Sequence, residues 1–131
     1  MILEAKIEKS GRWWAIEIPA LEIFTQGKSK ADALVMAASA IDDLAGRSLG
    51  TSARFEGERI LIHSKDVAGL VAMVLKHKRS RAGLSLNDVA KRLGGKSPNT
   101  YARYERGSSM PSVEVLDRLL AAVDGRGLVL G

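Results

Sequence analysis

The sequence predicts an α+β domain, with a sheet of three to four strands and one helix, followed by an all-α domain. Hydrophobic residues alternate with polar ones, with a period of two, in several stretches up to His63. From Asp66 onward they recur at helical spacing instead. We therefore place the two domains at residues 1–63 and 64–131, joined almost directly at Ser64-Lys65.

Composition narrows the class of protein. The chain has 131 residues, 46% of them hydrophobic, which is enough for one ordinary domain or two small ones. It has no cysteine, which excludes disulfides and thiolate metal sites and fits a reducing cytoplasm. Neither an apolar run of 18 residues nor a signal peptide is found, so we expect a cytoplasmic protein without a membrane span.

The net charge of +5 is unevenly distributed. Residues 1–63 hold 8 Lys/Arg and 9 Asp/Glu, a balance of −1, whereas residues 64–131 hold 12 and 6, a balance of +6. A basic surplus confined to one domain indicates phosphate binding, although charge alone would also fit a solubilising surface.

Three to four strands are expected in the first domain. Two of them form a hairpin around Ser10-Gly11, with alternating apolar residues at Leu3, Ala5 and Ile7 and then at Trp14, Ile16 and Ile18. Leu21–Thr25 is a third, short strand that ends at Gly27, and Arg59–His63 supplies a fourth.

One helix follows the third strand. Ser29, with Asp32 three residues later, marks its start, and Gly46 is the expected C-cap. Its apolar stripe should face the sheet and comprises Leu34, Ala37, Ala38, Ile41, Leu44 and Ala45. Trp14 is expected in the core; Trp13, on the opposite face of the strand, is either covered by loops or contacts a partner chain.

The second domain opens and closes with a longer helix. The first starts near Asp66 and ends in the basic run 76–81, whose charges favour a helix C-terminus and are also placed to meet phosphates. The last is capped by Ser112, with an apolar stripe at Val113, Leu116, Leu119, Leu120 and Val123. The apolar tail Leu128–Leu130 either pairs across a two-fold axis or packs on its own domain.

Between them lie two short helical patterns, Ser85–Leu93 and Ser97–Arg106, separated by residues 94–96. Such a pair is a helix-turn-helix motif, whose second helix enters the major groove of DNA. We expect Asn99 and Arg103 to read base edges. The remaining candidate DNA-binding residues are polar or basic and comprise Ser85, Asn87, Lys96, Ser97, Thr100, Arg106 and Ser108.

The string Tyr101–Gly107, followed by Pro111-Ser112, resembles the Cro/CI-type repressor helix-turn-helix, over roughly residues 70–123. The resemblance implies a homodimer, or a higher homo-oligomer, on operator double-stranded DNA, and an ion pair between Arg79 and Glu105. The sequence departs from the family at Leu86 and Pro98, where glutamines often read bases, and by one extra residue between the two helices.

The first domain carries a second resemblance, over roughly residues 2–45. Gly11-x-Trp13, Pro19 and the run Thr25-Gln26-Gly27-x-Ser29-x-x-Asp32-Ala33 are similar to the partial ribonuclease-H-like domain of HicB-type antitoxins, although the frequent Pro-Gly-Cys is absent. This resemblance implies an antitoxin that occludes the active site of a HicA-type mRNA-cleaving toxin and represses its own operon. Trp13 is the candidate toxin contact.

Two other classes stay open. One is a stand-alone transcriptional repressor whose first domain binds a ligand or oligomerises. The other is a metal-dependent nuclease, which would need a cluster of carboxylates; the acids here lie along solvated faces, and His63 and His77 have no neighbours at ligand spacing. We therefore expect no catalytic residues, no metal site and no cofactor.

Overall fold

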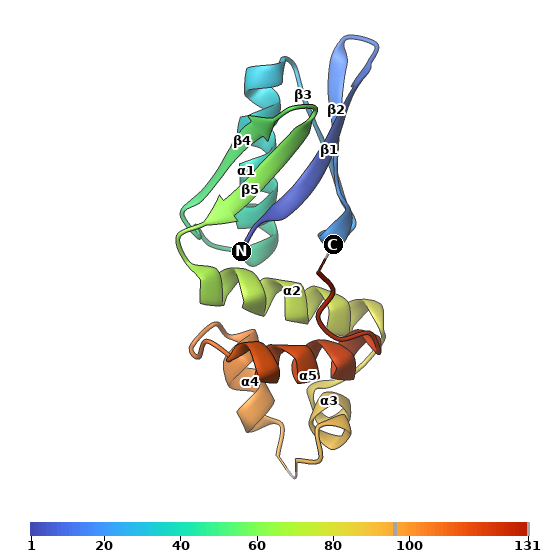
Figure 1. The fold of residues 1–131 in the computed structure, drawn as a ribbon, viewed down its shortest axis with the longest axis vertical. Coiled ribbons are helices and arrows are strands. Elements are labelled where there is room, and N and C mark those ends of the chain that lie inside the picture. The colour runs from blue at the N-terminus through green and yellow to red at the C-terminus, as the bar shows by residue number, and fades with distance from the viewer. Residues whose placement is uncertain (96, 131) are drawn as a thin grey trace. The chain divides into compact units, whose positions relative to one another are not determined.

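The structure is a computed structural model that describes residues 1–95 and 97–130 (Figure 1). Its contacts divide the chain into two compact units, Met1–Val67 and Ala68–Gly131. The first contains the sheet and one long helix, and the second contains only helices and loops among its described residues. Each unit is described by itself.

The N-terminal unit contains a five-stranded antiparallel sheet in the order β3-β2-β1-β5-β4. Its strands are β1 (Leu3–Ser10), β2 (Trp13–Ile18), β3 (Ile23–Gly27), β4 (Thr51–Glu56) and β5 (Arg59–Ser64). The expected hairpin is β1–β2. The expected total of three to four strands was wrong, because β4 was overlooked: only every second residue of this edge strand is partly buried, and none is fully buried.

The third strand starts two residues later than predicted. Pro19–Leu21 forms a 3-10 turn, which places Leu21 in the core with no exposed surface. Glu22 then takes a left-handed conformation with φ of 52° and redirects the chain into β3. The strand ends at Gly27, as predicted.

Helix α1 (Lys30–Ala45) covers one face of the sheet and has the predicted caps. The Ser29 hydroxyl oxygen accepts from the Asp32 N–H at 3.0 Å, and Gly46 ends the helix with φ of 72°. The buried face is narrower than expected and comprises Ala33, Ala37 and Ile41, whereas Leu44 is 46% exposed. At the start of α1 a small residue, Ala33, faces the sheet because its backbone lies very close to Gly27 of β3.

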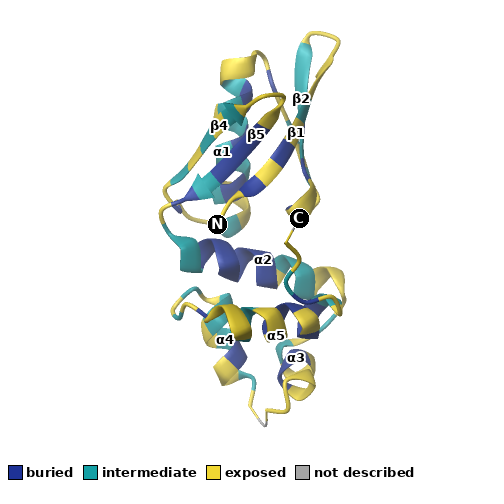
Figure 2. Ribbon diagram, viewed as in Figure 1, coloured by how far each residue is buried: buried dark blue, intermediate teal, exposed yellow. Residues whose placement is uncertain are grey.

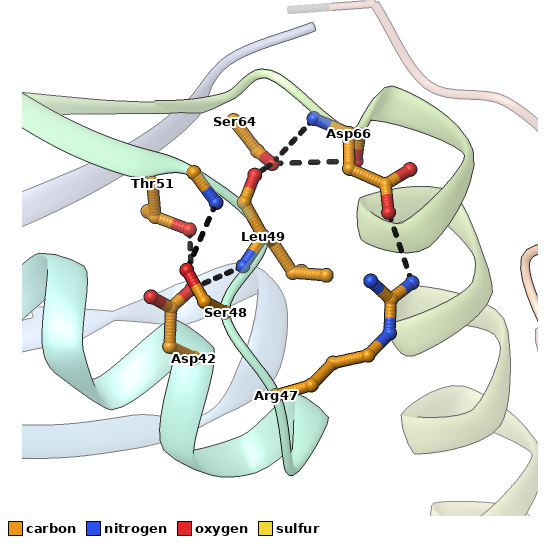
Figure 3. Close-up of polar contacts among 8 residues, drawn as sticks. Asp42, Arg47, Ser48, Leu49, Thr51, Ser64 and Asp66 are labelled. Atoms are coloured by element: carbon orange, nitrogen blue, oxygen red, sulfur yellow. Dashed lines mark hydrogen bonds and ion pairs between the residues drawn. The ribbon is translucent and has the colours of Figure 1, made fainter.

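The connection between α1 and β4 is fixed by polar contacts (Figure 3). Asp42 Oδ1 accepts from the Leu49 N–H at 3.1 Å and from the Thr51 hydroxyl at 2.6 Å. The buried Ser64 hydroxyl donates to the Leu49 carbonyl and accepts from the Asp66 N–H at 3.1 Å. These contacts bind the end of β5 to the loop before β4.

The C-terminal unit is built from four helices: α2 (Val67–Arg81), α3 (Leu86–Arg92), α4 (Asn99–Glu105) and α5 (Val113–Asp124). Its buried side chains come from all four and include Leu75, Val89, Tyr101, Leu119 and Val123 (Figure 2). Ser112 caps α5 as predicted, by accepting from the Val115 N–H at 3.2 Å. Val113 does not belong to the apolar stripe: it lies in the first turn and is 73% exposed.

The apolar tail after α5 forms no strand within residues 125–130. Its first residue packs on its own unit, where the Leu128 N–H donates to Asp117 Oδ1 at 2.8 Å. Val129 and Leu130 are exposed. Among the described residues, no helix has both the length and the apolar character needed to span a bilayer.

Candidate nucleic-acid interface

The first helix of the motif, α3, begins with a complete capping box. The Ser85 hydroxyl oxygen accepts from the Asp88 N–H at 3.0 Å, and Asp88 Oδ2 accepts from the Ser85 N–H at 2.8 Å. These two bonds with Ser85 lower the pKa of Asp88. The Ser85 hydroxyl can still donate its own proton to a phosphate.

The turn between α3 and α4 depends on a left-handed glycine. Gly94 follows Leu93 with φ of 79°, and its N–H donates to the Lys91 carbonyl at 3.0 Å. The Gly95 N–H donates to the Ala90 carbonyl at 2.9 Å, which satisfies another carbonyl at the end of α3. Lys96, a predicted phosphate contact, lies outside the described residues.

Helix α4 has one buried and one open face. Tyr101 is 2% exposed and lies in the core, where burial raises the pKa of its hydroxyl. Asn99, Thr100 and Arg103 are exposed, and no hydrogen bond or ion pair engages their side chains in the described part of the chain. Asn99 and Arg103 are four residues apart, so their side chains project from the same side of the helix.

An ion pair between the end of α4 and α2 fixes the orientation of α4. Glu105, its last residue, accepts from Arg79 of α2 through Nε at 2.8 Å and Nη2 at 2.7 Å. The side-chain hydrogen bonds with Glu105 raise the pKa of Arg79. Arg79 is thus a positioning residue for α4, as the family resemblance implied.

The other predicted DNA-binding residues differ in whether their side chains already form hydrogen bonds within the chain. Arg106 is exposed directly after α4, and Asn87 is exposed in the first turn of α3. The Ser97 hydroxyl oxygen accepts from the Asn99 N–H at 3.3 Å. The Ser108 hydroxyl donates to the Arg103 carbonyl at 3.0 Å, so its proton is already used within the chain.

A cleft of about 410 Å³ lies beside α4 and brings in a residue that the sequence did not suggest. Ser97, Thr100 and Tyr104 line one side of it, and Val115 and Arg118 of α5 line another. Arg118 is exposed and falls outside the apolar stripe of α5. This position outside the stripe is the one feature of the sequence that could have indicated a surface role for Arg118. It adds a cation close to two predicted phosphate contacts.

In the basic run at the end of α2, the structure shows the structural role, and contact with phosphates stays a prediction. Lys78 Nζ is 3.0 Å from Asp124 Oδ2 and is therefore part of a structural ion pair. Lys76 and Arg81 are exposed in the same stretch. Arg92 of α3 is also used structurally, because its Nη1 donates to the Ala122 carbonyl of α5 at 3.0 Å.

In the N-terminal unit, Trp13 and Trp14 are both only partly buried. Trp13 faces the side of the sheet away from α1, at the end of the hairpin. Trp14 lies on the helix side, where Lys9 Nζ and Lys30 Nζ are 5.5 Å and 5.3 Å from its ring centroid. Trp14 is therefore a packing residue at the rim of the core rather than a fully buried one.

Across the described ranges, no group of three or more His, Asp or Glu side chains is placed to hold a metal ion. The two histidines are in separate surroundings. His63 Nε2 lies 2.9 Å from the Ser52 hydroxyl, an interaction between neighbouring strands.

A comparison with protein families agrees with this geometry. Residues 75–126 match a family model described as a helix-turn-helix, which spans α3, α4 and α5 together with the end of α2. The C-terminal unit is thus a helix-turn-helix domain, and the match supports DNA binding and regulation of transcription. No curated protein matches the chain.

Proposed function

We propose that the protein is a dimeric operator-binding repressor that inserts α4 into the major groove. The observation that carries this proposal is the open face of α4, where Asn99, Thr100 and Arg103 are exposed and without partners in the described part of the chain. An exposed polar face on the second helix of such a motif is the arrangement that reads a groove. In the core, the same helix is held by Tyr101 and Glu105.

The side chains divide into two roles. Arg103 is suited to the O6 and N7 acceptors of guanine, and Asn99 to the N6 and N7 groups of adenine. We assign phosphate contacts to Ser97, Thr100 and Arg106, and we add Arg118 because it lines the same cleft as Ser97 and Thr100. Lys96, Ser85, Asn87 and Ser108 complete the proposed set at the edges of the motif.

We further propose that the chain is a HicB-type antitoxin, without catalytic activity or cofactor, whose N-terminal unit occludes a HicA-type toxin. Support comes from the sequence resemblance and from an N-terminal unit that carries the matching residues at structurally defined places. Gly27 lies where α1 approaches β3, and Ser29 and Asp32 form the N-cap of α1. Trp13, at the end of the hairpin, remains the proposed toxin contact.

The DNA proposal is tested by measuring the affinity of the full chain for the region upstream of its gene and for random duplexes. We expect tighter binding to the upstream region, with log affinity falling steeply against log salt, by several units of slope. Equal affinity for both duplexes, or an affinity that does not change with salt concentration, would contradict the proposal that the protein is a repressor.

The antitoxin proposal has a separate readout. The chain is expressed together with any short protein encoded beside its gene, and the complex is purified and assayed for RNA cleavage. We expect a stable complex that does not cleave RNA. Operator binding without such a complex would leave the stand-alone repressor as the function.

A further inference from the structure

The two edges of the sheet differ in how they are protected. An edge strand exposes unpaired N–H and C=O groups, and monomeric proteins usually shield them with charged residues. At one edge, β4 carries Arg54 and Glu56. At the other edge, β3 has the sequence IFTQG, without a charge, and its Phe24 is 75% exposed. The β3 edge is therefore open to pairing with another strand.

A groove of about 420 Å³ runs beside this edge on the side of α1. Ile23 and Thr25 of β3 line it, and α1 contributes Met36, Ala40 and Leu44, of which only Leu44 was predicted to face the sheet. Leu44 is 46% exposed because nothing in the N-terminal unit covers this part of the helix. A strand added to β3 would direct alternate side chains into the groove.

The residues that flank β3 indicate which strand fits. Glu22 precedes the strand and Lys28 follows it, and both are exposed. In an antiparallel pair of two β3 strands with a two-fold axis at Thr25, residue 22 of each copy lies opposite residue 28 of the other. Both residues lie just outside the paired strands, so this register brings an acid and a base of the two copies near one another beyond each end of the pairing, where opposite charges attract.

The same symmetry would also close the groove. A two-fold axis perpendicular to the sheet keeps both α1 helices on one face. The second copy's α1 would then lie over Met36, Ala40 and Leu44, and would remove their apolar surface from water. Isologous contacts of this kind use the same patch on both chains.

We propose that β3 pairs with β3 of a second copy of this chain and joins two sheets into one continuous ten-stranded sheet around a two-fold axis. This interface lies in the N-terminal unit, outside the domain to which dimerisation was assigned from the sequence. It supplies the two-fold symmetry that a pair of helix-turn-helix domains needs on a two-fold operator. It does not depend on whether a toxin is bound.

The test is a charge-swap series on the full chain, followed by sedimentation equilibrium at low salt. Glu22→Lys and Lys28→Glu each create two pairs of like charges across the axis, and each should raise the dissociation constant about tenfold. The double variant Glu22→Lys/Lys28→Glu restores both pairs with reversed polarity and should return the constant to near the wild-type value. Glu56→Lys on β4 is the matched control and should change it less than twofold.

Hydrogen exchange provides the second readout. Backbone amides within Ile23–Gly27 should gain protection as protein concentration rises, while those of Thr51–Glu56 should not. A wild-type chain that stays monomeric at high concentration would overturn the proposal. An oligomer whose dissociation constant is unchanged by the two single variants would also overturn it, whether the β3 edge is then unpaired or pairs with a different protein. Single variants that weaken association without rescue in the double variant would overturn it as well.

Discussion

Arg79 and Glu105, 26 positions apart, form a two-point ion pair beneath the end of α4. Their side chains are only 17% and 7% exposed, respectively. Arg79 also donates through Nη1 to the Leu84 carbonyl at 2.9 Å, in the segment that leads into α3. One guanidinium thus connects α2, the start of the motif and its second helix.

Removing one member of this pair should destabilise the helix-turn-helix unit strongly. Glu105→Ala leaves a largely buried guanidinium without its main partner, and losses of about 3 to 5 kcal/mol are typical of such changes. Urea unfolding measures the effect. Arg47→Ala is the matched control: Arg47 pairs with Asp66 at 2.9 Å, but the two side chains are 50% and 36% exposed. That substitution should cost about 1 kcal/mol or less, and equal losses would show that burial does not determine the strength of these pairs.

Arg103→Ala should reduce discrimination between DNA sequences. Arg103 is exposed on α4 and is free of side-chain partners in the described residues, so its loss should leave stability almost unchanged. If it binds a guanine in bidentate fashion, its removal costs about 1 to 3 kcal/mol on operator DNA, and much less on random DNA. Arg12→Ala, in the exposed turn of the hairpin, removes the same charge and should spare specificity. Both affinities come from fluorescence anisotropy; equal losses on the two duplexes would reassign Arg103 to the phosphates.

Asp124 should make the helix-turn-helix unit sensitive to acid. Burial raises the pKa of Asp124, but the Arg126 N–H at 2.8 Å and Lys78 Nζ at 3.0 Å more than offset it, so the pKa lies below its ordinary value. A lowered pKa in the folded state stabilises the fold above the unfolded-state pKa of about 3.9, and this stability is lost as the pH falls through the folded-state pKa.

Asp124→Asn tests this dependence. At pH 7 the variant should be less stable than the wild type by about 1 kcal/mol, because it loses a partly buried ion pair. The difference should shrink as the pH falls below about 4, because Asp124 of the unfolded wild-type chain then takes up a proton while the folded chain still holds the carboxylate charged. Urea midpoints measured from pH 7 to pH 3 give the comparison. A gap that stays constant over this range would mean that Asp124 does not titrate in the folded state as its contacts imply.

Local sequence patterns predicted several of the helix ends correctly. Ser29, Ser85 and Ser112 were each predicted to cap a helix, and each accepts the expected backbone N–H. Gly46 and Gly94 were predicted to end helices and both have positive φ. Capping depends on residues within one turn, so the sequence contains all the information that it requires.

Features with a weak local pattern, or that depend on distant residues, were harder to predict. Strand β4 was missed because its inward residues are Thr51, Ala53 and Phe55 rather than a run of large apolar groups. The same limit applies to the candidate site: the exposed face of α4 was predictable from helical periodicity. Arg118 was not, because it reaches the cleft only through the packing of α5 against the motif.

The start of α1 approaches the backbone of β3 closely at Ala33, and this approach can be tested at Gly27. A Cβ atom on Gly27 would lie 2.5 Å from the Ala33 nitrogen and 2.7 Å from its Cα, both of which are backbone atoms that cannot move aside alone. Gly27→Ala should therefore cost about 3 kcal/mol or more, at or beyond the upper end of ordinary overpacking. Gly46→Ala is the matched control, because Gly46 has φ of 72° but nothing within 4 Å of its missing Cβ. Gly46→Ala should reduce the free energy of unfolding only by the cost of a left-handed backbone at a residue with a Cβ, about 1 to 2 kcal/mol. The free energies of unfolding should rank in this order, and a Gly27→Ala variant no less stable than Gly46→Ala would mean that α1 can move away from the sheet at little cost.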